Sequence, residues 1–162
     1  HHPFEVEKAE ALGVPAGPER GQLVNGKSIT LADGTIITPD MVLGDTVRGV
    51  KLAITGDTGR TDNIRDYVKN SDILVTEATF VDEDREIARN FGHLTAKQAA
   101  ELARDVEARY LMITHISRRY REYDVVREAK TVFPKSIVVR DLDHYSIRRE
   151  QPLEKIVPDT GG

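Results

Sequence analysis

The spacing of hydrophobic positions changes near residue 47. Before it, glycine and proline interrupt the pattern densely, and Gly13–Pro18 cannot lie inside a helix or strand because its prolines fix φ and lack an amide donor. Further along, Asp33-Gly34 lies between two short apolar segments, which is typical of a hairpin turn. We therefore expect residues 1–46 to form a small appendage (the arm), with a short helix within residues 3–12 and little core of its own.

From Val47 onward, short apolar runs typical of buried strands alternate with segments whose apolar residues recur every three or four positions. Thr95 followed by Gln98 is the pattern of a capping box at the start of a helix. The expected strands lie at 50–54, 73–75, 110–113, 137–140 and 145–148, and the expected helices at about 61–68, 82–90, 95–106 and 125–133. This order predicts an α/β fold over residues 47–150, and residues 151–162 are expected to be a flexible tail.

Composition excludes several classes of protein. The chain has 162 residues and a formal net charge of −4, which is inconsistent with a uniformly basic nucleic-acid binder. It has no cysteine, so disulfides, zinc–thiolate sites and cysteine nucleophiles are excluded, and any metal must be held by histidine and carboxylate. No apolar run approaches the ~18 residues of a membrane span. We expect a soluble, cytoplasmic protein.

Polar side chains follow three of the expected strands. Asp57, Glu77 and His115 each come just after an apolar run, where the carboxyl ends of parallel strands form one edge of a sheet. Asp57 and His115 are ligand types that bind zinc or manganese. Two plainer interpretations stay open: the glycines around Asp57 also suit a simple turn, and His115 also suits a core histidine with satisfied hydrogen bonds.

A second group of residues suits proton transfer and phosphate binding. His93 lies two positions before the helix cap, and a carboxylate such as Glu77 would raise its basicity and fix its tautomer. The run Ser117–Arg121 follows His115 and contains three arginines. Guanidinium groups suit bidentate phosphate binding, although a solvated helix start would have the same composition.

These segments together resemble a known family. Gly56-Asp57-Thr58, Thr76–Phe80, His93-Leu94-Thr95 and Thr114–Tyr120 occur in the order seen in ribonuclease Z, the tRNA 3′-processing endonucleases of the metallo-β-lactamase superfamily. The likeness extends upstream to the glycine- and proline-rich segment and the hairpin. It covers nearly the whole chain to about Asp141.

The resemblance implies a role for each matching residue. Asp57 would bridge two Zn²⁺ ions, with Mn²⁺ as an alternative, and His115 would be a terminal ligand of one of them. His93, oriented by Glu77, would donate a proton to the departing ribose oxygen. Phosphate and substrate contacts would come from Arg119, Tyr120, Thr79 and Thr95, and the arm would contact precursor tRNA through Gly13, Pro15, Gly17 and Pro18.

The chain also departs from the family pattern. It has Thr76 where the family usually has histidine, and Leu94 where the family has serine. The His-x-His-x-Asp-His motif, which supplies most metal ligands of the superfamily, is absent from the 162 residues. We therefore expect the C-terminal half of an αββα sandwich, which binds metal weakly and is inactive without the missing N-terminal half.

The resemblance also implies a homodimer, and an apolar sheet face left open by the missing half would favour association. Two other functions stay open at this stage. One is a different phosphodiesterase or hydrolase of the same fold, and the other is a non-catalytic RNA-binding or assembly module.

Overall fold

The computed structural model describes residues 1–157, which form two compact units. The first unit comprises His1–Gly49, and the second begins at Val50. The boundary lies three residues beyond the expected end of the arm, within the segment where the hydrophobic spacing changes.

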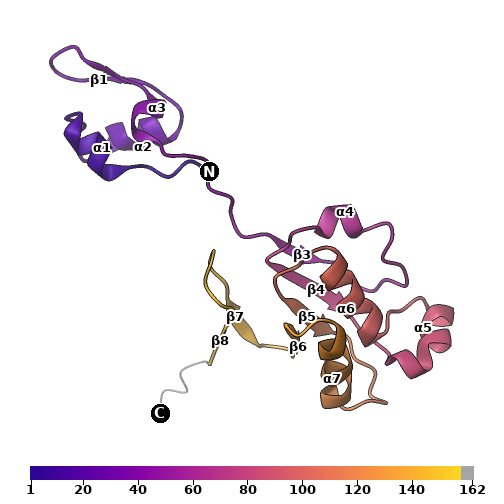
Figure 1. Cartoon of the computed structure of the whole chain (residues 1–162). Coiled ribbons are helices and arrows are strands. Elements are labelled where there is room, and N and C mark those ends of the chain that lie inside the picture. The colour runs from indigo at the N-terminus through magenta and orange to yellow at the C-terminus, as the bar shows by residue number, and fades with distance from the viewer. Residues whose placement is uncertain (158–162) are drawn as a thin grey trace. The chain divides into compact units, whose positions relative to one another are not determined.

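The first unit contains three short helices and one hairpin (Figure 1). In chain order these are α1 (Val6–Ala11), α2 (Pro18–Val24), β1 (Ile29–Thr30), β2 (Ile36–Ile37) and α3 (Pro39–Val42). The predicted hairpin is confirmed, because β1 and β2 pair antiparallel. In the turn, Thr35 N donates to Asp33 Oδ1 at 2.9 Å, and Gly34 has a φ of 86° that favours glycine.

The expectation that the arm has little core was wrong. The first unit buries one apolar cluster, consisting of Ala9, Val14, Leu23, Ile29, Ile37 and Val42. Most of its short elements supply a single buried side chain, so the cluster has no repeat that a helix or strand period would reveal. The first unit is therefore a small packed body of its own.

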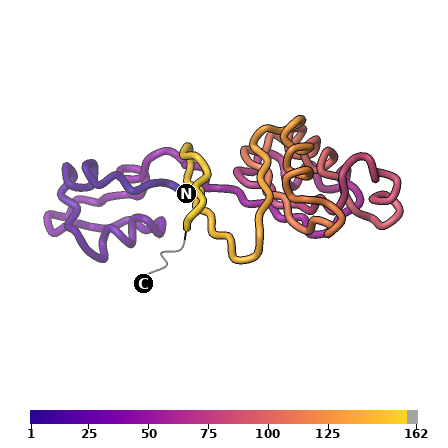
Figure 2. Tube along the Cα trace, turned by 90° about the horizontal axis from the view of Figure 1, so that it is seen from below, coloured from indigo at the N-terminus to yellow at the C-terminus, as the bar shows by residue number. Residues whose placement is uncertain are grey.

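The second unit is built on a parallel sheet of four strands in the order β3-β4-β5-β6. Its elements are β3 (Leu52–Ile54), α4 (Arg65–Val68), β4 (Ile73–Glu77), the 3₁₀ turn η1 (Asp82–Asp84), α5 (Arg85–Phe91), α6 (Ala96–Asp105), β5 (Leu111–Thr114), α7 (Glu122–Val132), β6 (Ser136–Val138), β7 (His144–Ser146) and β8 (Glu154–Ile156). The last two strands form a separate antiparallel hairpin, which follows the body of the unit along the chain (Figure 2).

One face of the parallel sheet packs against helices α6 and α7. Leu74 and Leu111 are register partners on this face, and both are fully buried in the main core cluster. The next residues along each strand point to the other face, because side chains alternate along a strand. On that face Leu52 and Ile54 of β3 are 57% and 68% exposed. The sheet thus carries one covered face and one face with exposed apolar side chains at the β3 edge.

Several element boundaries differ from expectation; for example, the strands expected at 137–140 and 145–148 are β6 (Ser136–Val138) and β7 (His144–Ser146). Helix α4 begins only at Arg65, and Asp82 lies inside η1 rather than capping the helix that follows. The segment expected to be a flexible tail contains β8, which pairs with β7; residues 158–162 of that segment lie outside the described residues. Within residues 1–157, no helix is long and apolar enough to cross a membrane.

Candidate metal and acid–base site

Asp57, His93 and His115 come together at the carboxyl edge of the parallel sheet. One ligand atom from each of the three lies within 4.8 Å of the others. The Asp57 Oδ1 and His115 Nδ1 atoms are 2.5 Å apart, and the His93 and His115 rings meet edge to face with centroids 5.3 Å apart. Residues 58 positions apart in the sequence therefore share one group. The His115 side chain is 47% exposed, which excludes the interpretation of His115 as a core histidine.

Unusual backbone conformations aim these side chains. Gly56 before Asp57 has a φ of 63°, and His115 itself has a φ of 51°, a left-handed conformation that is uncommon outside glycine. The loop after β3 also touches the loop before α6, since a Cβ on Gly59 would lie 2.7 Å from the backbone of Gly92. Gly59 was not predicted to make this contact, although a glycine at the end of Gly-Asp-Thr-Gly is the signal for such a close approach.

Glu77 connects the loops that carry these three residues through hydrogen bonds. Its side chain is 1% exposed, and its Oε1 accepts hydrogen bonds from His93 Nδ1 at 3.0 Å, Leu94 N at 3.1 Å and Thr58 N at 3.2 Å. Its Oε2 accepts from both the amide and the hydroxyl of Thr79, at 3.0 and 2.6 Å. We call these five donations the Glu77 network. Because a carboxylate accepts the Nδ1 proton, the Nε2 atom of His93 is the ring nitrogen left for a ligand or a proton.

The two threonines expected to contact substrate face inward. Thr79 is 7% exposed. Its hydroxyl oxygen lies 2.6 Å from Glu77 Oε2 and 3.0 Å from the His115 carbonyl oxygen. Thr95 is fully buried and forms the predicted capping box, in which its Oγ1 accepts from Gln98 N. The structure therefore gives both hydroxyls a role in holding loops, because neither is exposed to a phosphate.

The phosphate-binding candidates after β5 lie in different surroundings. The Tyr120 hydroxyl donates to the Asp84 carboxylate, while the Arg119 side chain is exposed. Burial and the Asp84 carboxylate raise the pKa of Tyr120 to about 12, so its phenol stays protonated at neutral pH. Tyr120 is thereby tied to η1, and Arg119 is the more accessible of the two.

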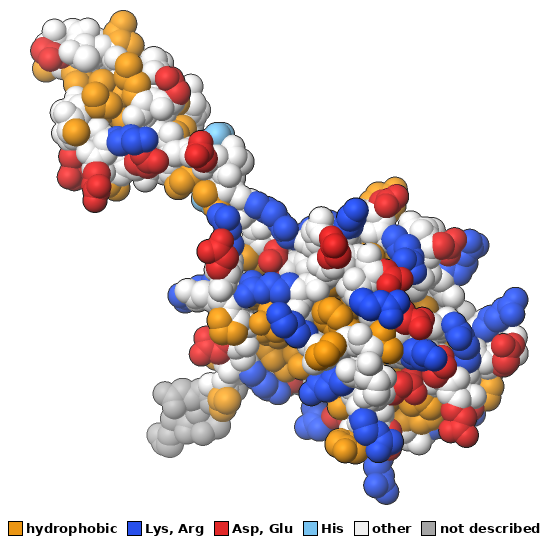
Figure 3. Space-filling view, in the orientation of Figure 1, with side chains coloured by type: hydrophobic (Ala, Val, Ile, Leu, Met, Phe, Trp, Pro, Cys, Tyr) orange, Lys and Arg blue, Asp and Glu red, His pale blue; other side chains and the backbone are white. Residues whose placement is uncertain are grey.

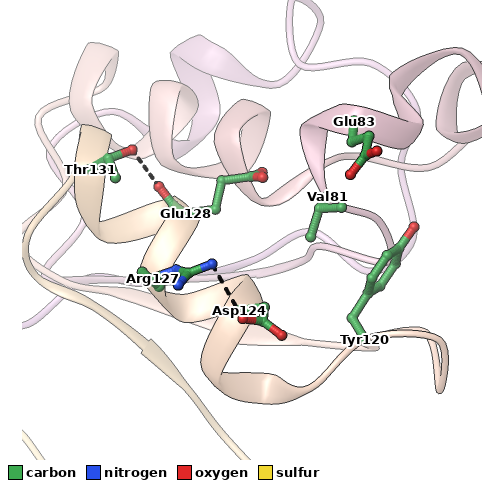
Figure 4. Close-up of a pocket in the computed structure, with 7 residues that line it drawn as sticks. All are labelled: Val81, Glu83, Tyr120, Asp124, Arg127, Glu128 and Thr131. Atoms are coloured by element: carbon green, nitrogen blue, oxygen red, sulfur yellow. Dashed lines mark hydrogen bonds and ion pairs between the residues drawn. The ribbon is translucent and has the colours of Figure 1, made fainter.

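A groove of about 510 Å³ lies beside Tyr120 (Figure 4). It is lined by Val81, Glu83, Tyr120, Asp124, Arg127, Glu128 and Thr131. Glu128 Oε1 accepts hydrogen bonds from the amides of Asp82 and Lys97, both at 3.0 Å, and Arg127 lies 3.4 Å from Asp124. The groove is lined by three carboxylates and only one arginine, so its charge would repel a phosphate. We therefore do not include the groove in the candidate site.

The arm residues expected to contact tRNA shape the loop between α1 and α2. Gly17 precedes α2, and Pro18 is its first residue, where the missing proline amide has no cost. Gly13 has a φ of 76°, and Arg20 donates to the Pro15 carbonyl at 3.2 Å. The first unit carries seven acidic and four basic residues, so any contact with RNA there depends on local backbone rather than on net charge.

Comparison with known proteins identifies the class. Residues 24–116 match the family model described as a beta-lactamase superfamily domain, so the chain belongs to the metallo-β-lactamase superfamily. The solved metallo-beta-lactamase fold protein YhfI from Bacillus subtilis superimposes with a TM-score of 0.51 at 25% identity, over 55% of this chain and 35% of that one. The predicted fold class is confirmed.

Within this superfamily the chain is similar to proteins named Ribonuclease Z. It is 44% identical to the Bradyrhizobium diazoefficiens protein over 138 aligned residues. The aligned region is 85% of this chain and 46% of that protein. The Archaeoglobus fulgidus protein is 44% identical over 141 residues, with the same two shares. The resemblance to ribonuclease Z is confirmed, and the chain spans about half the length of the relatives it matches.

Proposed function

We propose that this chain is the C-terminal part of a metal-dependent endoribonuclease that removes the 3′ trailer from precursor tRNA. The observation that carries the proposal is the convergence of Asp57, His93 and His115 beside a buried carboxylate. The likeness to proteins named Ribonuclease Z over 85% of the chain supports the substrate class. The activity belongs to the whole protein, of which this chain supplies part of the site.

The donor set suits zinc or manganese, because it combines a carboxylate with imidazole nitrogen. In the complete protein, Asp57 and His115 would help to hold the metal ions. Such ions supply Lewis-acid stabilisation of the phosphoryl oxygens when bound. The chain itself has histidine and carboxylate donors of the type required, and the remaining ligands would come from the N-terminal half.

The residues of this chain also supply the general acid. Glu77 accepts the Nδ1 proton of His93 and thereby orients the ring, and a protonated Nε2 then gives its proton to the departing ribose oxygen. Arg119 and Tyr120 would lie along the phosphate backbone, with Arg119 making the direct contact. On the face shown in Figure 3, basic side chains lie among acidic ones over the second unit, which is consistent with local rather than general phosphate binding.

The open sheet face indicates where the other half belongs. Leu52 and Ile54 are more than half exposed, and the two-sheet sandwich of the superfamily would cover them. We propose that the N-terminal half packs on this face, that the complete protein is a cytoplasmic homodimer, and that the arm contacts the tRNA body through Gly13–Pro18.

Complementation tests this function. The chain is co-expressed with the part of the Bradyrhizobium ribonuclease Z that precedes the aligned region, and the purified complex is assayed on a precursor tRNA with a 3′ trailer. We expect trailer release by the complex and none by the chain alone, and loss of release in Asp57→Ala and His93→Ala complexes. Cleavage of a small phosphodiester without cleavage of precursor tRNA would indicate a different hydrolase. RNA binding without cleavage, unchanged by Asp57→Ala, would indicate a non-catalytic module.

A further inference from the structure

A pocket of about 350 Å³ lies at the amino edge of the parallel sheet, at the opposite ends of the strands from the candidate metal site. Tyr110, which precedes β5, and Ser136, which begins β6, both line it. Tyr110 and His115 are five residues apart along β5, which corresponds to roughly 16 Å in an extended strand. This amino-edge pocket is therefore separate from the site described above.

Lysine and tyrosine dominate the lining of the amino-edge pocket. The described residues that line it include Lys130, Lys135, Lys155, Tyr110 and Tyr145, and none of them is acidic. Lys155 Nζ lies 2.5 Å from Asp143 Oδ1, whereas Lys130 and Lys135 form no ion pair within residues 1–157. Two ammonium groups without a carboxylate partner thus line one pocket of a chain whose net charge is −4.

The two tyrosines hold these cations in place. Lys135 Nζ lies 5.3 Å from the centre of the Tyr110 ring, and Lys155 Nζ lies 5.6 Å from that of Tyr145, which are cation–π distances. The Tyr110 hydroxyl oxygen accepts a hydrogen bond from Leu153 N at 3.1 Å. In the part of the chain that the structure describes, the phenol proton itself has no acceptor, so it can be donated to an anion.

Arg109 fastens the far wall of the pocket to the sheet. Its guanidinium donates to the carbonyls of Arg148 and Gln151, in the loop between β7 and β8, and lies 5.4 Å from the centre of the Tyr110 ring. Together with the bond from Leu153 N, these contacts hold the β7–β8 segment against the start of β5. The pocket is therefore formed before any ligand binds, which lowers the free-energy cost of binding.

We propose that the amino-edge pocket binds the phosphodiester backbone of single-stranded RNA. Ammonium groups attract phosphate, and basic residues interleaved with aromatic rings are the combination that single-strand-binding proteins use. A pocket within the ~300–1,000 Å³ range of small-ligand sites can take a nucleotide of a single strand, whereas a duplex would lie across its mouth. The groove beside Tyr120 has the opposite charge, with three carboxylates and one arginine.

This inference rests on the proposed function in taking RNA as the ligand. It adds a second contact with that RNA, at a phosphate away from the bond that is cut, because the pocket and His115 lie at opposite edges of the sheet.

The salt dependence of RNA binding tests the inference. Binding of the whole chain to a fluorescein-labelled, unstructured RNA of about 12 nucleotides is followed by anisotropy without added metal. Affinity for a single strand varies with about the −0.7 power of salt concentration for each phosphate contact. The double variant Lys130→Ala/Lys135→Ala should therefore reduce the salt slope by about 1.4 and weaken binding roughly 60-fold at about 50 mM salt.

A matched control removes the same charge elsewhere in the second unit. Lys69→Ala/Arg104→Ala changes two exposed residues that do not line the pocket, and it should bind like the parent. Lys130→Arg/Lys135→Arg keeps both charges and should keep the parental slope. Lys130 and Lys135 are exposed, so these variants should fold, and circular dichroism verifies that they do.

Three results would overturn the inference. The first is no RNA binding by the parent chain at about 50 mM salt, and the second is equal affinity and slope in the two alanine double variants. The third is displacement of the RNA by an equal concentration of inorganic phosphate, which would indicate a site for free phosphate. None of these results depends on cleavage, so the inference can fail while complementation releases the trailer, and it can hold while complementation fails.

Discussion

Replacing Glu77 by alanine removes the acceptor of all five donations in the Glu77 network without touching a metal ligand of the proposed site. Two of the donors that lose their partner are the amides of Thr79 and Leu94, which belong to residues only 7% and 1% exposed. The other amide, on Thr58, and the His93 ring are closer to solvent, so water can replace part of what they lose.

The magnitude follows from the buried amides. A buried donor left without an acceptor costs about 1–3 kcal/mol, so two such donors cost roughly 2–6 kcal/mol. Against a domain stability of about 5–15 kcal/mol, this is a large fraction of the free energy of unfolding. We expect Glu77→Ala to destabilise the second unit by that amount and to loosen the His93 loop.

Urea unfolding followed by tyrosine fluorescence measures this loss in the second unit alone. The chain has no tryptophan, and its five tyrosines, at positions 67, 110, 120, 123 and 145, all lie beyond Gly49. Glu86→Ala on α5 is the matched control: Glu86 is exposed, and the change should stay within about 0.5 kcal/mol. A loss below about 1 kcal/mol in Glu77→Ala would refute the argument that the network is needed to satisfy buried amides.

Two further predictions concern the loop contact and the tyrosine. Gly59→Ala places a Cβ 2.7 Å from the Gly92 backbone, so it should lower the free energy of unfolding by about 1–3 kcal/mol and weaken zinc binding. Gly21→Ala is the control, because the space around Gly21 is open, and it should have neither effect. Equal behaviour of the two variants would contradict the close approach. Tyr120 has a raised pKa of about 12, so its stabilising contribution is complete below pH ~10 and is lost as pH rises towards 12. Ultraviolet titration should therefore show one late phenolate step that Tyr120→Phe removes, and ionisation of every tyrosine near pH ~10 would count against it.

The parts of the fold that depend on local signals could be predicted from the sequence. The capping box at Thr95 and Gln98 and the hairpin at Asp33-Gly34 involve residues two or three apart, and both are present. The four parallel strands follow from apolar runs separated by helical spacing. The core of the first unit could not be predicted, because its members come singly from separate short elements and share no period.

The candidate site was only partly predictable for a related reason. Topology brings Asp57 and His115 to one edge, since each follows a parallel strand. Thr79 and Thr95 were expected to contact substrate, but both are buried. Their burial could not be predicted from the sequence, because tertiary packing decides which way a hydroxyl points. The support that Glu77 gives to Thr58 N spans 19 residues and had no pattern to reveal it.

The order of events at the site follows from the Glu77 network. All five of its hydrogen bonds form between residues of this chain and require no ion. The entropy cost of ordering the Asp57 and His93 loops is therefore part of the folding of the second unit and is not added when a metal ion binds. A preorganised site loses less free energy on binding than one that must be assembled. The affinity of this half for a metal ion is therefore limited by the number of its ligands rather than by the disorder of its loops. On this reasoning, adding ligands from a second half should strengthen metal binding without rearranging the Glu77 network.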